Sequence, residues 1–522
     1  MRRFFLSASR EHSAFSATLL LMLSSVLSGL LGLARTKYIA HVFGISRATD
    51  AYNAAFNLPD MINYFLVGGV ASITLVSILN RHRERGDEEG ADRALRVVLV
   101  AMTLVLGTGI VLAEIFTPVY TRVFFNRLDP ATAALCTHLT RILLPGQLFF
   151  FAGGALGSRL LVRKIFLYQA LTPIVYNLGI IFGGVLLQAR VGIDSLAFGV
   201  LAGAFVGSLA LNGVGVARGG MRFTPVLNPV RALGDPAFVE WLKLSLPLMV
   251  GVSLAMADKW ILSYYAAGDK GAISLLTNAK TFFNAPLSVI GMAAGAASLP
   301  FFSKLFAQDR MYDFNHAVSR AVSRLIGVAL LVTAWMAALG APIVDLLRGG
   351  SYSAEDAALT ARYFLLFSLS LALWSAQGIY ARAFYAARNT LTPAISGTVV
   401  TVCSIPIYAL LFGRIGVTGL AVASDVGILA HTLALALLLH RARLVSLATL
   451  DFGEIGRALG AAAVAYGCTA ATVRFLPRPP GHPGDLAIIV TGSLVWAAAG
   501  VLVLQVTGSR LLRQVLDRKM GA

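Results

Sequence analysis

The sequence predicts an all-α polytopic membrane protein with about 14 transmembrane helices, because its apolar residues fall in runs of roughly 20. Only 13% of the 522 residues are charged and 57% are hydrophobic, whereas soluble domains carry about 25% charged residues. The runs also lack the residue-by-residue alternation of a transmembrane β-barrel. This composition excludes a soluble enzyme, a disordered chain and a disulfide-stabilised scaffold.

The first predicted span follows a basic start, Met1–Arg3, and its apolar stretch is too long for the core of a signal peptide. We therefore expect a retained first helix. Charged connectors separate the later runs, and none is long enough to hold a separate soluble domain. The predicted spans are residues 13–34, 50–79, 94–117, 132–158, 168–188, 195–217, 240–266, 273–303, 319–344, 357–381, 391–412, 416–440, 455–475 and 485–506.

Basic residues concentrate in both termini and in the even-numbered connectors. Because cytoplasmic loops of membrane proteins carry an excess of Lys and Arg, we expect both termini to be cytoplasmic. The same distribution explains the net charge of +18 without a nucleic-acid partner. An even number of spans agrees with this orientation.

An internal repeat relates two halves of the chain. Phe56–Pro59, with Gly68 nine residues after Pro59, matches Phe283–Pro286, with Gly295 nine residues after Pro286. Two further matches follow in the same order: residues 171–173 with 391–393, and 191–197 with 415–421. Matched spans differ by six helices, an even number, so the repeat predicts two parallel six-helix lobes and alternating access between them.

The repeat divides the chain into an N-lobe at residues 1–217, a C-lobe at 218–445, and a segment at 446–522 with two extra helices and a tail. Prolines remove a helix hydrogen bond and glycines permit bending or close packing, so both can form hinges. Kinking and packing without movement explain the same residues equally well. The candidate hinge residues are Pro59, Gly68, Gly69, Pro286 and Gly295.

Ionisable side chains inside predicted spans are the candidate site residues. A charge in the bilayer costs at least ~2.5–3.5 kcal/mol, so it usually faces a cavity or a partner. Arginine and lysine suit a pyrophosphate, since Arg offers a two-pronged fork and Lys a compact charge. The candidates for a phosphate-facing central cavity are Arg35, Lys280, Asp50 and Arg362, and those for ion coupling are Asp425 and Asp258.

The first three candidates differ in how strongly the sequence supports them. Arg35 follows a long apolar run and is the strongest cavity candidate, with Lys280 second. Asp50 could instead be the N-cap of the second span, because Asp is a favoured capping residue.

The remaining candidates also have structural alternatives. Asp258 and the adjacent Lys259 could neutralise each other, and Arg362 lies near a predicted helix end. Asp425 lies deep in an apolar span and could be a proton or cation site, or a partnered structural carboxylate.

Motifs for catalysis or metal binding are missing from the sequence. It contains no Walker A loop, GxSxG elbow or HExxH pair, and its three cysteines are widely separated. We therefore expect a protein that is not an enzyme and has no cofactor. Transport would then draw on an ion gradient, the membrane potential or the gradient of the substrate.

An ordered series of motifs resembles the MurJ/MviN lipid II flippase family of the multidrug/oligosaccharidyl-lipid/polysaccharide exporter superfamily. The clearest motif is Arg382–Pro393, which is similar to the connector between the family's tenth and eleventh helices. The resemblance extends over roughly residues 25–445. The other matching stretches are Gly32–Arg35, Phe43–Gly44, Ala48–Ala51, Ala55–Asp60, Pro286–Gly291 and Leu299–Lys304.

The resemblance implies a transporter in the bacterial inner membrane that moves a polyprenyl-pyrophosphate-linked saccharide, lipid II for peptidoglycan, to the periplasmic leaflet. It implies a cationic cavity, a lipid-tail groove shaped by the last two helices, and a role in cell-wall synthesis and cell shape. Its partners would be the lipid-linked saccharide, membrane lipids and cell-wall synthesis proteins. The family's first-helix arginine corresponds to Arg35, and the aspartate of its Ala-Thr-Asp-Ala motif corresponds to Asp50.

Several charged positions of the family differ here. Gly29 replaces a second first-helix arginine, Asn63 and Tyr64 replace an Arg-Arg pair, and Gly68 replaces an acidic residue. Thr281 occupies a basic position, with Lys280 one residue away. A diverged flippase for another lipid-linked saccharide is therefore an alternative. So are a drug/cation antiporter of the superfamily, against which the two extra spans argue, and an envelope scaffold.

Overall fold

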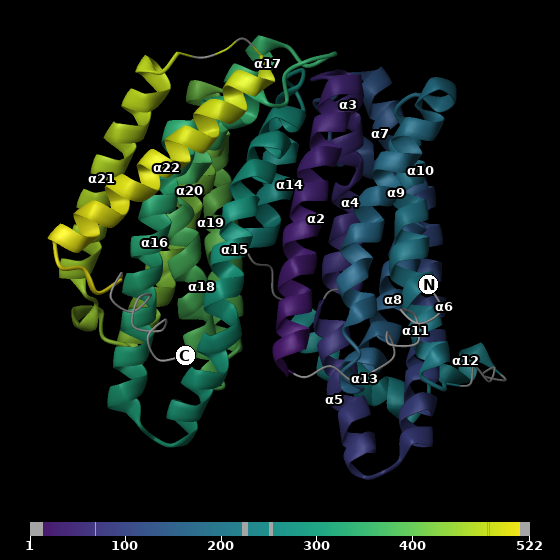
Figure 1. Cartoon of the computed structure of the whole chain (residues 1–522). Coiled ribbons are helices and arrows are strands. Elements are labelled where there is room, and N and C mark those ends of the chain that lie inside the picture. The colour runs from purple at the N-terminus through teal and green to yellow at the C-terminus, as the bar shows by residue number, and fades with distance from the viewer. Residues whose placement is uncertain are drawn as a thin grey trace. The chain divides into compact units, whose positions relative to one another are not determined.

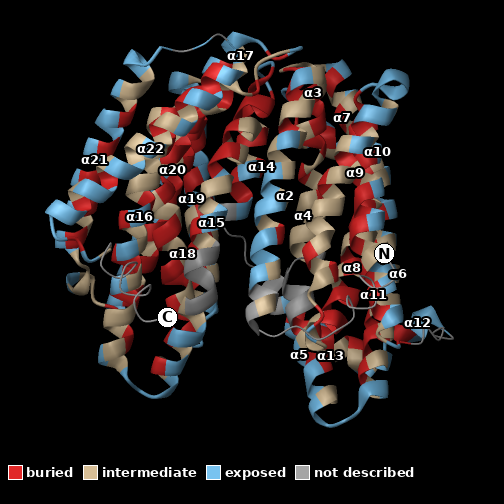
Figure 2. Cartoon of the chain, viewed as in Figure 1, coloured by how far each residue is buried: buried red, intermediate tan, exposed pale blue. Residues whose placement is uncertain are grey.

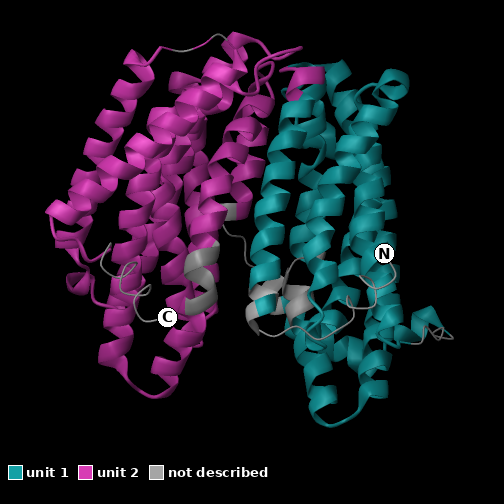
Figure 3. Cartoon of the chain, in the orientation of Figure 1, with its two compact units in different colours: residues 1–39, 46–250 teal, residues 40–45, 251–522 magenta. Residues whose placement is uncertain are grey.

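The computed structural model describes residues 14–67, 69–221, 228–249, 254–477, 479 and 481–511. Their regular secondary structure is helical, with one isolated β-bridge between Gly349 and Tyr352. The chain forms two compact units, residues 1–39 with 46–250 and residues 40–45 with 251–522 (Figures 1 and 3). The all-α class is thus confirmed.

The first unit holds most of α2 and the helices up to α13. Its elements are α2 (Ala14–Phe43), α3 (Arg47–Ala55), α4 (Asn57–Ile62), the π-helix η1 (Asn63–Val67), α5 (Gly69–Glu84), α6 (Glu88–Phe124), α7 (Pro130–Leu143), α8 (Gly146–Val162), α9 (Leu167–Val191), α10 (Asp194–Ala204), the π-helix η2 (Phe205–Ala210), α11 (Leu211–Arg218), α12 (Pro229–Ala232) and α13 (Pro236–Met249).

The second unit holds the remaining helices. Its elements are α14 (Leu254–Ala266), α15 (Ala272–Ala307), α16 (Met311–Asp345), α17 (Ala354–Leu369), α18 (Leu371–Ala386), α19 (Leu391–Ile415), α20 (Val417–Arg441), the 3₁₀ turn η3 (Leu447–Thr449), α21 (Phe452–Phe475) and α22 (His482–Val506).

Ten helical segments of the described chain are long and apolar enough to span a membrane, or eleven if the α17–α18 pair, bent by 43°, is one span. The predicted spans 50–79, 240–266 and 273–303 each include residues that the structure does not describe fully. Fourteen spans therefore stays a prediction. The predicted second span is not one helix, because it breaks at Phe56 and continues through α4 and η1.

The outer faces of the helices are apolar where lipid would contact them. Figure 2 shows buried residues gathered inside each unit and exposed residues on the outward faces. On α6, Val111, Ile115 and Val119 are 59%, 60% and 55% exposed and lie four residues apart, which places them on one face of the helix. An apolar stripe of this kind fits contact with lipid rather than water.

Helices α9 and α10 approach each other closely through small residues. Gly179 and Gly183 on α9 face Gly203 and Gly199 on α10, and a Cβ added at Gly179 would lie 2.5 Å from the Cα of Gly203. Small residues four apart permit such approach of helix backbones in membranes. This crossing fixes the position of α9, which carries Asn177.

One pair of repeated positions has the same backbone geometry in both halves. Gly192 ends α9 with φ 58° and ψ −131°, and Gly416 ends α19 with φ 61° and ψ −144°. Positive φ favours glycine, since it has no Cβ. The matched glycines therefore both end a helix with the same backbone conformation.

The lobe boundary that the repeat places at residue 218 stays a prediction. In the structure, α12 and α13 pack against α5 and α6 in the first unit, although the repeat assigns them to the second lobe.

The last two helices pack on α16. The indole N–H of Trp335 on α16 donates to the Ser493 hydroxyl on α22 at 2.9 Å, and that of Trp496 donates to the Leu331 carbonyl at 2.8 Å. Figure 1 shows α21 and α22 along one flank of this unit.

Candidate functional site

Arg35 lies inside α2, half-buried, in a polar cluster of the first unit. Its guanidinium donates to the amide oxygen of Asn177 at 3.0 Å. The Asn177 amide group in turn donates to the Ser28 hydroxyl at 3.2 Å and to the Pro173 carbonyl at 3.0 Å. The partner in this hydrogen bond is a neutral amide, so it leaves the positive charge of the Arg35 guanidinium in place. Such a charge can receive a phosphate oxygen.

Two tyrosines, one buried and one half-buried, lie near this guanidinium. Tyr52 on α3 and Tyr176 on α9 both interact electrostatically with Arg35, and Tyr176 also interacts with Asp60 on α4. The first unit therefore brings four helices, α2, α3, α4 and α9, to one polar cluster.

Asp50 is not the cap of its helix, so this alternative prediction is wrong. Ser46 is the N-cap of α3: its hydroxyl accepts from the Thr49 backbone N–H at 3.2 Å, and the Thr49 hydroxyl accepts from the Ser46 N–H at 2.9 Å. This reciprocal pair is a capping box, and it starts the helix at Arg47. Asp50 lies within the first turn and is 1% exposed.

Lys280 on α15 lies at the centre of a second cluster, in the second unit. Its ammonium is 2.8 Å from the Asp258 carboxylate on α14 and donates to the Ser424 hydroxyl on α20 at 3.1 Å. The Tyr408 hydroxyl on α19 donates to the other oxygen of Asp258. The side chains of Lys280 and Asp258 are 16% and 6% exposed. Neither points outward to lipid.

Aromatic rings surround the same ammonium. It lies 4.1 Å from the ring centre of Phe367, 5.5 Å from that of Phe283 and 5.6 Å from that of Trp374. A cation over an aromatic face is attracted by the negative charge of that face. The rings thus attract the ammonium of Lys280 in addition to the Asp258 carboxylate.

The alternative in which Asp258 and Lys259 neutralise each other stays a prediction, but Asp258 has another cationic partner, Lys280. Consecutive helical side chains point ~100° apart, so Asp258 faces inward to Lys280 while Lys259 is exposed.

The two predicted ion-coupling carboxylates lie in one cluster. Asp425 on α20 interacts with Asp258 and Lys280 and lies beside Ser370. Its Oδ1 is buried and has no hydrogen-bond partner among the described residues. Arg362 on α17, in contrast, is exposed.

The candidate hinge residues have different surroundings. Pro59 is buried in α4, immediately before the π-helix η1, where the helix is already interrupted. Pro286 lies inside the continuous α15, as does Gly295. Gly69 begins α5, and Gly68 lies outside the described residues. Whether any of them moves stays a prediction.

Several cluster residues escaped prediction. Asn177, Tyr408 and Ser424 are polar side chains within apolar runs, and that contrast could have identified them. The aromatic rings around Lys280 gave no signal, because aromatic residues are common in membrane helices.

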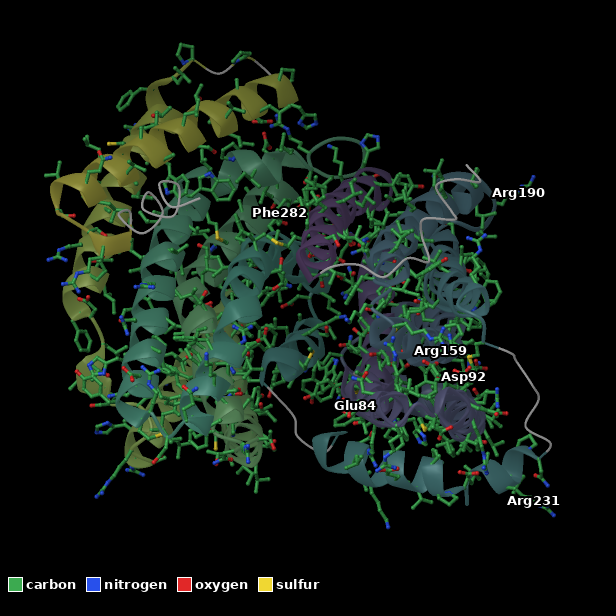
Figure 4. All side chains as sticks on the ribbon, turned by 60° about the horizontal axis from the view of Figure 1, so that its bottom comes forward. Glu84, Asp92, Arg159, Arg190, Arg231 and Phe282 are labelled. Atoms are coloured by element: carbon green, nitrogen blue, oxygen red, sulfur yellow. The ribbon has the colours of Figure 1, made fainter. Side chains whose placement is uncertain are left out.

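A charged cluster in the first unit is separate from these sites. Arg159 on α8 is 5% exposed and holds Asp92 on α6 with two contacts, at 2.5 and 2.9 Å. Figure 4 shows these two side chains side by side. The same Arg159 also donates to the Gly219 carbonyl at 3.3 Å. This pair joins the ends of three helices and has a structural role.

Apolar spanning helices that hold Arg and Lys side chains in polar clusters define a multi-pass membrane transport protein. The profile of the family described as lipid II flippase MurJ matches residues 39–489. The chain belongs to this family.

Individual relatives and solved structures agree. Lipid II flippase MurJ of Burkholderia cenocepacia is 28% identical over 425 residues, covering 77% of this chain and 80% of the relative. A relative from Thermotoga maritima with the same family name is 23% identical, covering 80% and 84%. A solved structure of lipid II flippase MurJ in an inward closed conformation has a TM-score of 0.77 at 21% identity, covering 93% of this chain and 99% of that one. An inward-facing transporter of the MATE family has a TM-score of 0.63 at 15% identity, covering 82% and 98%.

Proposed function

We propose that the protein flips lipid II, a polyprenyl-pyrophosphate-linked saccharide, from the cytoplasmic to the periplasmic leaflet of the bacterial inner membrane. Family membership supports the substrate class. The observation that carries the proposal is the Arg35 cluster, in which a guanidinium inside a spanning helix is held by a neutral amide. In this proposal the protein acts as a carrier, and both of its termini are cytoplasmic. Its partners are cell-wall synthesis proteins.

In this proposal Arg35 contacts the pyrophosphate. Asn177 fixes one edge of the guanidinium, leaving other N–H groups for phosphate oxygens. Lys280 stays a predicted phosphate contact, but its charge is already compensated by Asp258. Binding there would have to compete with a buried ion pair. Asp50 and Arg362 also stay predicted contacts, and alternating access stays the expectation from the repeat.

Reconstituted vesicles with fluorescent lipid II test the proposal. Hydrogen bonds to charged groups contribute ~1.5–3 kcal/mol, so Arg35→Ala should slow flipping by about tenfold to a hundredfold. Arg35→Lys should retain part of the rate, because it keeps the charge and loses the fork. The matched control is Arg190→Ala, which removes an exposed arginine at the end of α9 (Figure 4). An Arg35→Ala protein that flips at the wild-type rate would contradict the assignment.

The neutral residues at positions where the family has charged residues favour an alternative substrate. Asn63 donates to Gln147 at 2.9 Å, so it makes a neutral contact where the family has an arginine. The alternative is a flippase for another lipid-linked polysaccharide unit. Vesicles with a polyprenyl-pyrophosphate carrying a different saccharide would show faster flipping than with lipid II in that case.

A further inference from the structure

Arg382 on α18 is a half-buried cation of the second unit that lies outside both clusters. Its guanidinium donates to the backbone carbonyl of Gly291 on α15 at 3.4 Å, which is longer than the usual ~2.7–3.2 Å of an N–H···O bond. Among the described residues it has no acidic partner, and the side chain with which it interacts electrostatically is the phenol of Tyr385. An arginine inside a spanning segment usually faces a partner or a cavity.

The contact with Gly291 leaves most of the guanidinium available. Gly291 lies inside the continuous helix α15, where backbone carbonyls also accept the hydrogen bonds of the helix. A guanidinium has several N–H donors and no acceptor, so one contact with a neutral carbonyl uses a small part of it. The other N–H groups of Arg382 can therefore bind an anion.

Two glycines leave space beside this guanidinium. Gly378 lies four residues before Arg382, on the same face of α18, and Gly291 supplies the contacted carbonyl. A Cβ added at either glycine would meet nothing within 4 Å. The helices on both sides of the contact are therefore open next to Arg382, and a group of the size of a phosphate can approach it.

Tyr385 adds a second donor at the same place. It lies three residues after Arg382, in the last turn of α18, and is 45% exposed. A phenol can donate a hydrogen bond to a phosphate oxygen. The two side chains together provide a cation and a hydroxyl, which is a suitable donor set for a phosphate group.

The depth of Arg382 matches that of lipid phosphates. At ~1.5 Å per residue it lies ~6 Å from the end of α18 at Ala386, within the α17–α18 pair that is long and apolar enough to span a membrane when taken as one. The predicted orientation places this end at the cytoplasmic surface. The phosphates of the cytoplasmic leaflet lie in the headgroup region next to the hydrocarbon core, so Arg382 can meet them without leaving its helix.

Two lipids offer phosphate chemistry at this depth, a polyprenyl pyrophosphate and an ordinary phospholipid. The fork of an arginine can bind two phosphate oxygens at once. A pyrophosphate carries more negative charge than a phosphodiester, so a half-buried guanidinium attracts it more strongly. These points favour the pyrophosphate.

We propose that Arg382 and Tyr385 form a second pyrophosphate site, in the second unit, which takes the lipid-linked substrate from the cytoplasmic leaflet before its pyrophosphate reaches Arg35. This inference rests on the proposed flippase function and adds a binding step to it. The chain then has two pyrophosphate sites, one at each arginine. The step is binding alone, and no bond is made or broken.

The test counts these sites on the purified full-length protein in detergent, with farnesyl pyrophosphate as the probe and native mass spectrometry as the readout. The wild type should bind two probe molecules, whereas Arg35→Ala and Arg382→Ala should each bind one. The affinity of the altered site should fall by about tenfold to a hundredfold, because hydrogen bonds to charged groups are strong. Arg320→Ala, which removes an exposed arginine of α16, is the matched control and should still bind two.

Arg382→Lys separates recognition from packing. Lysine keeps the charge and loses the fork, so this variant should still bind farnesyl monophosphate at the site and lose its preference for the pyrophosphate. An arginine with a structural role alone would not affect that preference. In vesicles with fluorescent lipid II, Arg382→Ala should raise the lipid II concentration for half-maximal flipping by about tenfold and change the maximal rate less.

The outcomes separate this inference from the proposed function. A wild type that binds one farnesyl pyrophosphate, or an Arg382→Ala protein that still binds two, would overturn the second site, and the wild-type count does not depend on whether a variant folds. Loss of the Arg382-dependent probe molecule in an equal amount of phosphatidylglycerol would assign the residue to ordinary phospholipid and also overturn it. Absence of lipid II flipping by the wild type would overturn the function and leave the probe count unchanged.

Discussion

Replacing Lys280 by methionine tests whether the second unit depends on a buried ion pair. Methionine has a similar length and keeps contact with the rings of Phe367 and Trp374. The change removes the 2.8 Å ion pair to Asp258 and the 3.1 Å hydrogen bond to Ser424. Asp258 then remains buried, with Tyr408 as its hydrogen-bond donor.

Breaking a buried pair by removing one partner costs ~3–5 kcal/mol, because the other charge is left uncompensated. With about 2 °C per kcal/mol for a unit of this size, the melting temperature should fall by ~6–10 °C. The assay is thermal unfolding of the purified protein in detergent, followed by its intrinsic fluorescence. Lys259→Met, which changes an exposed lysine beside Asp258, is the control and should shift the melting temperature by about 1 °C or less.

The double variant Lys280→Met with Asp258→Asn distinguishes a charge effect from a packing effect. Replacing both members of a buried pair is often close to neutral, so the double variant should recover at least ~2 kcal/mol relative to Lys280→Met. Additive losses in the two single variants, or a shift below about 2 °C for Lys280→Met, would refute the reasoning.

Three other predictions concern the first unit. Arg159→Met should destabilise it by ~3–5 kcal/mol, since it strands Asp92, and adding Asp92→Asn should recover most of the loss in thermal unfolding. Gly179→Ala should cost ~1–3 kcal/mol because its Cβ would meet a backbone atom at 2.5 Å, whereas Gly109→Ala, with nothing within 4 Å, should stabilise its helix by ~0.5–1 kcal/mol. Hydrogen bonds from the Thr132 side chain and backbone lower the pKa of Asp129, so its stabilisation is present above the ordinary pKa of ~3.9 and is lost as the pH falls through the lower, folded value. The difference in melting temperature between wild type and Asp129→Ala should therefore shrink in acid, and a constant difference would contradict this.

Much of the candidate site could be named from the sequence one residue at a time. A charge inside an apolar run is visible without a structure, and Arg35, Asp258, Lys280 and Asp425 were all found in this way. The partners of these residues were not visible. Lys259 adjoins Asp258 in the chain, but the structure pairs Asp258 with Lys280.

The start of α3 shows the same limit on a smaller scale. Both Ser46 and Asp50 are favoured capping residues, and the sequence pattern did not choose between them. In the structure, Ser46 has the extended backbone of an N-cap residue, and its side chain caps the helix that begins at Arg47.

Composition and run length by themselves determined that this chain is a helical membrane protein, because the transfer of a segment into lipid depends on that segment alone. The repeated motifs and the family resemblance added the class of substrate. Only the tertiary structure decided which charges are compensated: Arg35 faces a neutral amide, Lys280 faces a carboxylate, and Asp425 and His431 keep buried polar atoms without described partners. Those pairings depend on how several helices are rotated about their axes, and a shift of one residue turns a side chain by ~100°.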